Sequence, residues 1–171
     1  MIVHKTQRLF LETWELEDFK SFASIARDPR VMRFIAEGDP WPDSRIEWFM
    51  GKQSALQESL GFCNWKLTDQ ASGELVGFCG LAPFPQVNEI EIGWWLNPAY
   101  WKKGLAFEAA ECVVGAAFEV HGISRIVARA YRANTSSIVL MERLGMEFNR
   151  VLDTNSVGDI VLFSLDNLNH R

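Results

Sequence analysis

The feature that most constrains the fold is a strand, a short loop with a glycine and a helix, which follow one another directly. The pattern at 89–96 predicts a strand, and the pattern at 107–120 predicts a helix. The loop that leads into this helix consists of Trp101, Lys102, Lys103, Gly104, Leu105 and Ala106. The first turn of a helix offers unpaired N–H groups and the positive end of the dipole to an anion. We therefore predict a phosphate-binding loop, with a plain strand–helix junction as the alternative.

Hydrophobic periodicity and turn residues predict strands and helices along the rest of the chain. Before the loop these are a strand at 8–13, a helix from Trp14 to about Ala26, a short helix at 31–35, a helix that follows the loop 38–44 and ends at Gly61, and strands at 62–68, 74–81 and 87–96. After it they are a helix at 104–120, a strand at 125–130, a helix at 134–144 and a hairpin of 146–152 with 157–165. The three consecutive strands are linked by turns, so we expect an antiparallel meander.

Two local signals refine these boundaries. Asp43 or Ser44 is expected to cap the helix that follows the loop 38–44, because Glu47 stands three residues after Ser44, at capping-box spacing. The prolines in Pro83-Phe84-Pro85 are expected to break the chain between the second and third strands of the meander.

The composition is that of an ordinary globular protein, with 171 residues of which 48% are hydrophobic and 23% charged. On length, one domain spanning residues 1–171 is expected. The net charge of −5 argues against a nucleic-acid partner, because phosphate binding needs a basic surface. The 3 cysteines are widely spaced and fit reduced thiols, and the 3 histidines lack metal-ligand spacing, so we expect no metal. Without a signal-peptide core or a membrane-length apolar run, a cytoplasmic protein is expected.

Two motifs in this order match a known pattern. The first is 98–106 (Pro-Ala-Tyr-Trp-Lys-Lys-Gly-Leu-Ala), and the second joins Asn134-Thr135-Ser136-Ser137 to 141–146 (Met-Glu-Arg-Leu-Gly-Met). With Thr6-Gln7-Arg8-Leu9 and the predicted element order, they make the chain resemble the GCN5-related N-acetyltransferase (GNAT) superfamily over essentially its whole length. The loop fits the Q/R-x-x-G-x-G/A pyrophosphate motif, except that Trp101 stands at the Gln or Arg position. This tryptophan is similar to that of the RimJ/RimL-type branch, the ribosomal-protein N-terminal acetyltransferases and their relatives.

The resemblance implies an α/β fold of mixed α+β type. Its sheet is expected to be mostly antiparallel, with six to seven strands, helices on both faces and a splay between the fourth and fifth strands. It also implies acetyl-CoA as co-substrate, with the diphosphate held by the backbone N–H groups of Lys102 through Ala106. The splay leaves strand-edge backbone, here that of Trp94, Trp95 and Leu96, for the pantetheine arm and the acetyl oxygen.

Acyl transfer to an amine also needs a base, because an ammonium ion cannot attack a thioester. Glu89 and Glu91 share one face of their strand, since side chains alternate with period two. Glu91 is nearer to the splay, and we prefer it as the base. The alternative is that both glutamates are solvated charges on an open face.

The thiolate that leaves benefits from a proton donor. Many GNAT enzymes place a tyrosine four residues past the Ser137 position, but here that residue is Met141, which cannot donate. The resemblance then leaves Ser137 as the donor, with Asn134 touching the pantetheine or ordering a water. In the alternative, Asn134 is only the N-cap of its helix and Ser137 a first-turn residue.

The acceptor is expected to be a primary amine, of a protein N-terminus or a small molecule, that attacks acetyl-CoA directly in a ternary complex. Asp39, Trp41 and Trp65 are candidates for an acidic and aromatic wall around a cation, although loop solvation and core packing are the commoner roles. No membrane partner is expected, and a homodimer is common in the family. The alternative function is a non-catalytic acyl-CoA-binding sensor or interaction module. A nucleotide-hydrolysing P-loop is excluded, because Leu105-Ala106 follow Gly104 in place of Lys-Ser/Thr.

Overall fold

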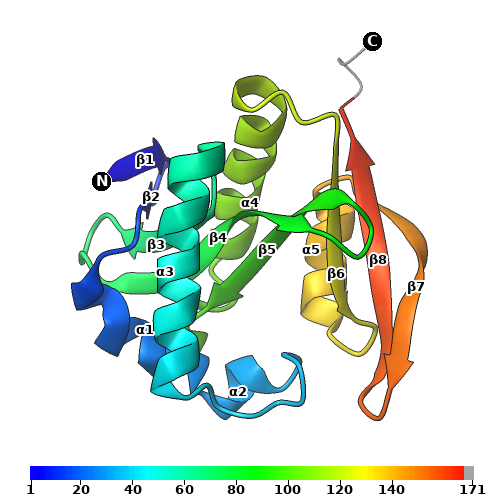
Figure 1. Ribbon diagram of the computed structural model, residues 1–171, viewed down its shortest axis with the longest axis horizontal. Helices are drawn as coiled ribbons and strands as arrows, with labels where there is room; N and C mark the ends of the chain where they lie inside the picture. The colour runs from blue at the N-terminus through cyan, green and yellow to red at the C-terminus, as the bar shows by residue number, and fades with distance from the viewer. Residues whose placement is uncertain (168–171) are drawn as a thin grey trace.

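The computed structural model describes residues 1–167, which contain one eight-stranded sheet in the order β1-β2-β3-β4-β5-β6-β8-β7 (Figure 1). The strands are β1 (Ile2–Lys5), β2 (Leu9–Glu12), β3 (Asn64–Asp69), β4 (Leu75–Phe84), β5 (Glu89–Leu96), β6 (Arg125–Tyr131), β7 (Glu147–Asn155) and β8 (Gly158–Asp166). The helices are α1 (Phe19–Ala26), α2 (Pro29–Met32), α3 (Asp43–Leu60), α4 (Leu105–Gly115) and α5 (Thr135–Arg143), with 3-10 turns at Leu16–Asp18 and Pro98–Tyr100. A π-helical turn, Ala116–Val120, continues α4. The predicted mixed, mostly antiparallel fold is thus confirmed.

The sheet has more strands than the six to seven expected, because the chain start adds the edge strand β1. This strand pairs with β2 alone, from Ile2↔Glu12 to Lys5↔Phe10, and its side chains are exposed or half-buried. Four residues without clear alternation carry no strand signal of their own. Pairing with β2, and not a local sequence pattern, therefore determines that residues 2–5 form a strand.

The expected antiparallel meander is confirmed, since β3 pairs with β4 and β4 with β5. The expected break at Pro83-Phe84-Pro85 is misplaced, because β4 continues through Pro83, which pairs with Ile90. Pairing with β3 ends at Asn64↔Gly80, where the Leu81 N–H donates to the Cys63 carbonyl. Beyond this point no strand of residues 1–167 pairs with β4 on that side, so the N–H that proline lacks costs no ladder hydrogen bond there.

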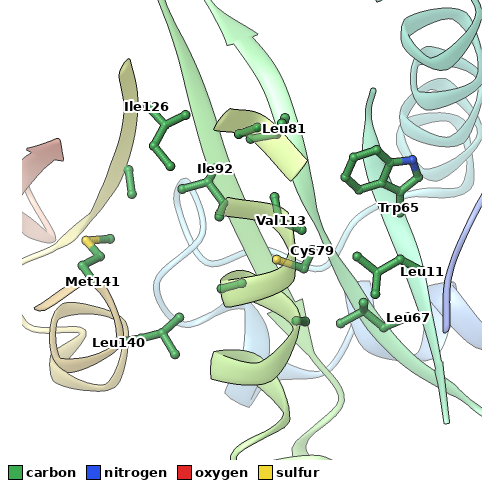
Figure 2. Close-up of a cluster of buried hydrophobic side chains, with 14 of the residues drawn as sticks. Leu11, Trp65, Leu67, Cys79, Leu81, Ile92, Val113, Ile126, Leu140 and Met141 are labelled. Atoms are coloured by element: carbon green, nitrogen blue, oxygen red, sulfur yellow. The ribbon is translucent and has the colours of Figure 1, made fainter. Parts of the chain in front are cut away.

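Helices cover both faces of the sheet (Figure 1). The helices α1, α2 and α3 lie on the face toward the viewer, called the front here, and α4 and α5 lie on the back. On the back, small residues let α4 approach the sheet closely, and Figure 2 shows Val113 beside Ile92 and Cys79. The front carries an aromatic cluster that consists of Trp14, Phe22, Trp41, Phe49, Phe78 and Trp95.

The start of α3 differs from the expected capping box. The N-cap is Pro42, no side chain caps the helix, and Asp43 forms an ion pair with Arg27 instead. The same arginine donates from Nε to the Trp41 carbonyl at 3.1 Å. Because Arg27 competes for the carboxylate, Asp43 fastens the segment before α3 to α1 rather than closing the helix end. Gly61 ends α3 with a φ of 78°, as predicted.

The strands β5 and β6 run parallel but part soon after they meet. Their register is limited to Ile90↔Ile126 and Glu91↔Val127. Beyond Glu91, β5 stays on β4 as far as Leu96, while β6 follows β8 as far as Tyr131. The backbone at 92–96 therefore has no strand partner on the β6 side. This is the expected splay, between the fifth and sixth strands once β1 is counted.

Three smaller findings concern thiols, metals and membranes. The cysteines Cys63, Cys79 and Cys112 are free, and burial raises the pKa of each, to about 12 for Cys63. Buried thiols of this kind are poorly reactive. Within residues 1–167, no cluster of three or more His, Cys, Asp and Glu side chains offers a metal site. Nor does any helix of that range combine the length and apolarity needed to cross a bilayer.

Candidate active site

The splay opens into a cavity of about 1080 Å³ that is lined from both faces of the sheet. The sequence-predicted residues that it brings together are Glu91, Trp94, Trp95, Leu96, Trp101, Lys102, Gly104, Leu105, Ala106, Asn134 and Ser137. Lys103 is not among the lining residues, because its ammonium lies over the Tyr100 ring, 4.9 Å from the centroid. The cavity therefore joins segments that are separated by more than forty positions in the chain.

The loop before α4 has the backbone of an anion-binding turn. Lys102 has a φ of 60° and Gly104 a φ of 77°, both in the left-handed region. Left-handed residues beside regular ones make successive N–H groups converge. Gly104 is the N-cap of α4 and no side chain caps the helix, so the first-turn N–H groups have no intrahelical partner. The loop thus combines converging donors with the positive end of a helix dipole.

Trp101 fastens this loop to the splayed strand. Its indole N–H donates to the Leu96 carbonyl at 2.8 Å, while its ring remains 42% exposed. The bond satisfies one of the carbonyl groups at the free end of β5 and fixes the distance between the loop and that strand. A tryptophan at the usual Gln or Arg position of the motif therefore has a structural role in this chain.

A second contact, which sequence reasoning missed, holds the loop from the N-terminal side. Glu108 accepts from Thr6 Oγ1 at 2.6 Å, from the Arg8 backbone N–H at 2.8 Å and from Arg8 Nε at 2.7 Å. We call Thr6, Arg8 and Glu108 the N-terminal brace. Arg8 Nη1 also donates to the Lys103 carbonyl at 2.9 Å, inside the loop. The sequence signal for this contact was the Thr6-Gln7-Arg8-Leu9 motif. It supported the family resemblance, but no function was assigned to its residues.

The electrostatics of the brace favour an ionised glutamate. Burial raises the pKa of Glu108, but the hydrogen bonds from Thr6 and Arg8 and the Arg8 charge outweigh it. The pKa of this carboxyl is therefore lowered from its usual value. A charged acceptor strengthens the hydrogen bonds that hold Arg8 against the loop.

Along β5, successive residues face opposite sides of the sheet. Trp94 and Leu96 pack with the back core, whereas Trp95 belongs to the front aromatic cluster, 4.7 Å from the Trp41 ring. Gly93 lies between Glu91 and Trp95 on the front. A Cβ on Gly93 would have only the Asn64 Oδ1 near it, at 3.8 Å, so the absence of a side chain leaves open space there.

Within the described residues, Glu91 is the acidic side chain that lines the cavity. Its Oε1 accepts from Arg129 Nε at 2.8 Å, and the side chain is 20% exposed. Burial raises the pKa of this carboxyl, opposed by the charge and hydrogen bond of Arg129 and the charge of Lys52. Glu89 lies outside the cavity, 3.6 Å from Arg125. Of the two candidate bases, Glu91 lines the cavity and Glu89 does not, and the pKa of Glu91 is raised.

The helix α5 brings Asn134 and Ser137 to the back of the cavity. Asn134 is the N-cap of α5, and its Oδ1 accepts from the Ser137 N–H at 3.4 Å. Both residues also line the cavity, so the capping role and a role in the site are compatible. Met141 is 1% exposed and packs in the back core, away from the lining.

The front wall differs from the acidic and aromatic wall considered for a cation. Trp41 lines the cavity, but Asp39 is exposed outside it. Trp65 is fully buried, and its Nε1 donates to Gln57 at 2.8 Å, so its role is core packing. Sequence reasoning missed Arg33 and Arg45, which line this wall. They stand in no motif, because they reach the cavity from the α2–α3 segment and from α3.

Comparison with known proteins agrees with this architecture. The model of the acetyltransferase (GNAT) domain family matches residues 8–147. The FsC-acetyl coenzyme A-N(2)-transacetylase of Aspergillus fumigatus is 30% identical over 153 residues, 82% of this chain and 63% of that protein. The structure of a GNAT-family acetyltransferase from Bacillus anthracis has a TM-score of 0.82 at 25% identity, over 97% of this chain and 98% of that chain.

The ribosomal L7/L12 alpha-N-protein acetyltransferase RimL, solved in complex with coenzyme A, shares the fold. Its TM-score is 0.82 at 12% identity, over 97% of this chain and 98% of RimL. The family match spans the loop, the splay and α5, which are the parts that build the cavity. The chain belongs to the GNAT acetyltransferase family.

Proposed function

We propose that the protein is an acetyl-CoA-dependent N-acetyltransferase that moves an acetyl group to a primary amine in a ternary complex. The observation that carries the proposal is the cavity at the splay, which joins the loop 101–106 to the half-buried Glu91. Loop and helix-start groups approach this cavity from the back, and Glu91 faces the front. A thioester and an amine that enter from opposite faces meet where β5 and β6 part.

The residues on the back suit acetyl-CoA, which supplies the thioester when bound. The N–H groups of Lys102 through Ala106 and the α4 dipole hold the diphosphate. The free edge of β5 at Trp94, Trp95 and Leu96 offers N–H and C=O groups to the amides of the pantetheine arm and a donor to the thioester carbonyl. Asn134 contacts the pantetheine or orders a water beside it.

Glu91 acts as the general base. It takes a proton from the acceptor ammonium, directly or through one water, and the free amine then attacks the thioester carbonyl. A carboxylate with a raised pKa is a stronger base than an exposed one while it remains ionised near neutral pH. The hydrogen bond from Arg129 orients the carboxylate on the front face.

Ser137 is the proton donor to the leaving thiolate in this mechanism. As the new C–N bond forms and the C–S bond breaks, Ser137 Oγ donates a proton to the thiolate. The proton that the attacking nitrogen loses then returns to Ser137 through water. The thiolate has an ordinary pKa of about 8.5, so a nearby donor helps it to leave. Ser137 takes this role because Met141, where many GNAT enzymes place a tyrosine, carries no donor and lies in the core.

We further propose that the chain belongs to the RimJ/RimL-like branch. The support is the sequence pattern at Trp101, at Asn134 through Ser137 and at 141–146. The branch admits either a protein N-terminus or a small amine as acceptor. One domain over residues 1–171, expected from the length, and a cytoplasmic location, expected from the sequence, remain predictions. A homodimer remains a prediction of the resemblance.

The test is release of free CoA, followed with a thiol reagent, across protein N-termini, aminoglycosides, polyamines and amino acids. We expect release that depends on one class of amine, together with calorimetric binding of acetyl-CoA alone. A non-catalytic acyl-CoA sensor is the second candidate, favoured by the buried Met141. Acetyl-CoA binding without turnover on the whole panel would support the sensor, and absence of binding would count against both.

A further inference from the structure

The front wall of the cavity is basic although the chain is acidic overall. The net charge is −5, yet Glu91 is the one acidic residue among the described lining residues. The basic residues that line the cavity are Arg30, Arg33, Arg45, Lys102, Arg129 and Arg143. Lys102 and Arg143 belong to the loop and α5 and suit the phosphates of the co-substrate. The other four arginines come from α2, the α2–α3 segment, α3 and β6, and they need a separate explanation.

Two of these four arginines have carboxylate partners. Arg30 binds Asp28, with Nε and Nη2 at 2.9 and 2.5 Å from the carboxylate oxygens, and Arg129 binds Glu91. Arg33 and Arg45 have none within residues 1–167. Their guanidinium groups lie over aromatic rings, 5.1 Å from the Phe34 centroid and 4.6 Å from the Trp41 centroid. Stacking of this kind leaves the edge donors of a guanidinium free for an anion.

The acidic residues of the same segment do not compensate these charges inside the cavity. Glu37 and Asp39 follow Arg33 in the chain, but both are exposed and neither lines the cavity. Asp43 precedes Arg45 and is paired with Arg27. Arg33 and Arg45 are exposed, and an excess of one charge around a concave site still raises the local concentration of ligands of the opposite charge. The front wall therefore favours an anion.

Arg33, Arg45 and the proposed base Glu91 line the same cavity. Glu91 and Trp95 both lie on the front of β5, and Trp95 contacts Trp41, which in turn carries the Arg45 guanidinium. Gly93 leaves the gap between Glu91 and Trp95 open. An acceptor amine that reaches Glu91 from the front therefore passes the ring and charge of the Trp41–Arg45 pair.

Two lining residues of the cavity that are far apart in the chain, Ala36 and Tyr131, are joined by a hydrogen bond. The Tyr131 hydroxyl on β6 donates to the Ala36 carbonyl at 3.1 Å and accepts from Asn155 Nδ2 at 2.9 Å. The bridge links the α2–α3 segment across to β6 and β7. Ala36 is held there with a φ of 46°, which is unusual for a residue with a side chain. A cavity whose walls are joined in this way suits a small molecule better than a polypeptide, which needs an open groove.

We propose that the acceptor is a small amine that also carries a carboxylate or phosphate group, which Arg33 and Arg45 bind while the amine faces Glu91. The inference rests on the proposed N-acetyltransferase function and names the substrate class of the same cavity. Arginine binds both kinds of anion through its planar fork of donors. This reverses the sequence-based expectation of an acidic wall for a cation.

The first test uses matched pairs of acceptors that differ only in the anionic group. The pairs are glutamate with glutamine, phosphoethanolamine with ethanolamine, and an acidic hexapeptide with its Asn/Gln counterpart. We expect kcat/KM for the charged member of at least one small pair to exceed its neutral partner roughly ten- to hundredfold, as for charge-assisted hydrogen bonds. The preferred pair distinguishes carboxylate from phosphate. Equal kcat/KM within both small pairs, or a preference confined to the peptides, would overturn the proposal.

The second test removes the two charges. In the Arg33→Gln/Arg45→Gln double variant, KM for the charged acceptor should rise roughly tenfold or more, with KM for its neutral partner and the Kd of acetyl-CoA unchanged. Arg150→Gln removes a charge from the exposed strand β7 and is the control, with no change expected. A double variant that retains the wild-type preference for the charged acceptor would refute the role of the arginines.

A binding measurement separates this inference from the proposed catalysis. Glu91→Gln saturated with CoA is titrated with each small pair, and binding is followed by calorimetry. Tighter binding of the charged member, lost when both arginines are replaced, supports the anion site even if no amine is acetylated. Equal binding of both members, with or without the arginines, overturns the anion site whether or not turnover is observed.

Discussion

The two sides of the splay are built from different parts of the chain. On the back, the groups proposed to hold the co-substrate are largely backbone: the loop before α4, the free edge of β5 and the start of α5. On the front they are side chains of separate elements, such as Glu91, Trp41 and Arg45. Backbone sites depend on conformation and therefore persist when side chains change, whereas a side-chain wall can change freely. One fold can thus keep its co-substrate and vary its acceptor.

The largest effect should come from the front. Glu91→Gln keeps the shape of the residue and removes the base, so kcat should fall roughly 10²- to 10³-fold while the acetyl-CoA affinity stays constant. The acidic limb of the kcat/KM profile should disappear with it, because Glu91 must be ionised and its pKa is raised. Glu89→Gln is the matched control, since Glu89 lies on the same strand outside the cavity. Equal turnover of wild type and Glu91→Gln would remove Glu91 from the mechanism.

Two glycines allow each side to be blocked separately. Gly93→Val should fill the open front of β5 and raise KM for the amine about tenfold or more, with little change in acetyl-CoA affinity, because a strand tolerates valine. Gly104→Val should weaken acetyl-CoA binding and leave KM for the amine nearly unchanged. Its φ of 77° disfavours a β-branched residue by about 1–2 kcal/mol, which weakens acetyl-CoA binding roughly tenfold. Calorimetry and initial rates distinguish the two, and parallel effects of both variants would contradict the division into two sides.

A smaller effect is expected at α5. Ser137→Ala removes the proposed donor but keeps the backbone N–H that Asn134 accepts, so kcat should fall about tenfold without loss of stability. Ser136→Ala, at the neighbouring lining position, is the control for removal of a hydroxyl group. The readouts are kcat from CoA release and the urea midpoint of unfolding. An unchanged kcat would leave Ser137 as a first-turn residue only.

Much of the fold was predictable, because most elements carry local signals. Periodicity and turn residues located the meander, and Gly61 marked the end of α3 as expected. The errors arose where tertiary contacts outweigh the local sequence pattern. The segment β1 forms a strand because it pairs with β2. Pro83 stays in β4 because, within residues 1–167, β4 has no strand partner on the β3 side beyond Gly80. Asp43 left its expected capping role because Arg27 binds it.

The candidate site was predictable on the back and less so on the front. The loop and the Asn134–Ser137 stretch are contiguous motifs, and the preference for Glu91 over Glu89 selected the glutamate that lines the cavity. The N-terminal brace joins residues 102 positions apart, and Arg33 and Arg45 reach the cavity without any shared spacing. Such contacts follow only from the packing of the helices on the sheet. The sequence therefore offered candidates for a cation site but no sign that the assembled wall is basic.

The smallest effect should come from the N-terminal brace. Its removal tests whether acetyl-CoA binding on the back of the splay depends on side chains as well as on backbone groups. The pKa of Glu108 is lowered in the fold, so its ionisation stabilises the protein above the ordinary glutamate pKa. That stabilisation is lost as the pH falls through the lower, folded value. Glu108→Gln should therefore flatten the loss of unfolding free energy between pH 6 and 3, as measured by urea denaturation, and weaken acetyl-CoA binding about two- to fivefold at pH 7.

Glu111→Gln is the matched control for this prediction, since Glu111 is an exposed residue of the same helix without an ion pair among the described residues. If Glu108→Gln and wild type lose stability in parallel on acidification, the Glu108 carboxylate does not hold the brace. If acetyl-CoA affinity is also unchanged, the loop keeps its conformation without the Arg8–Glu108 ion pair. The back of the splay would then rest on Gly104, Trp101 and the α4 dipole alone, and the contrast with the side-chain-built front would become sharper.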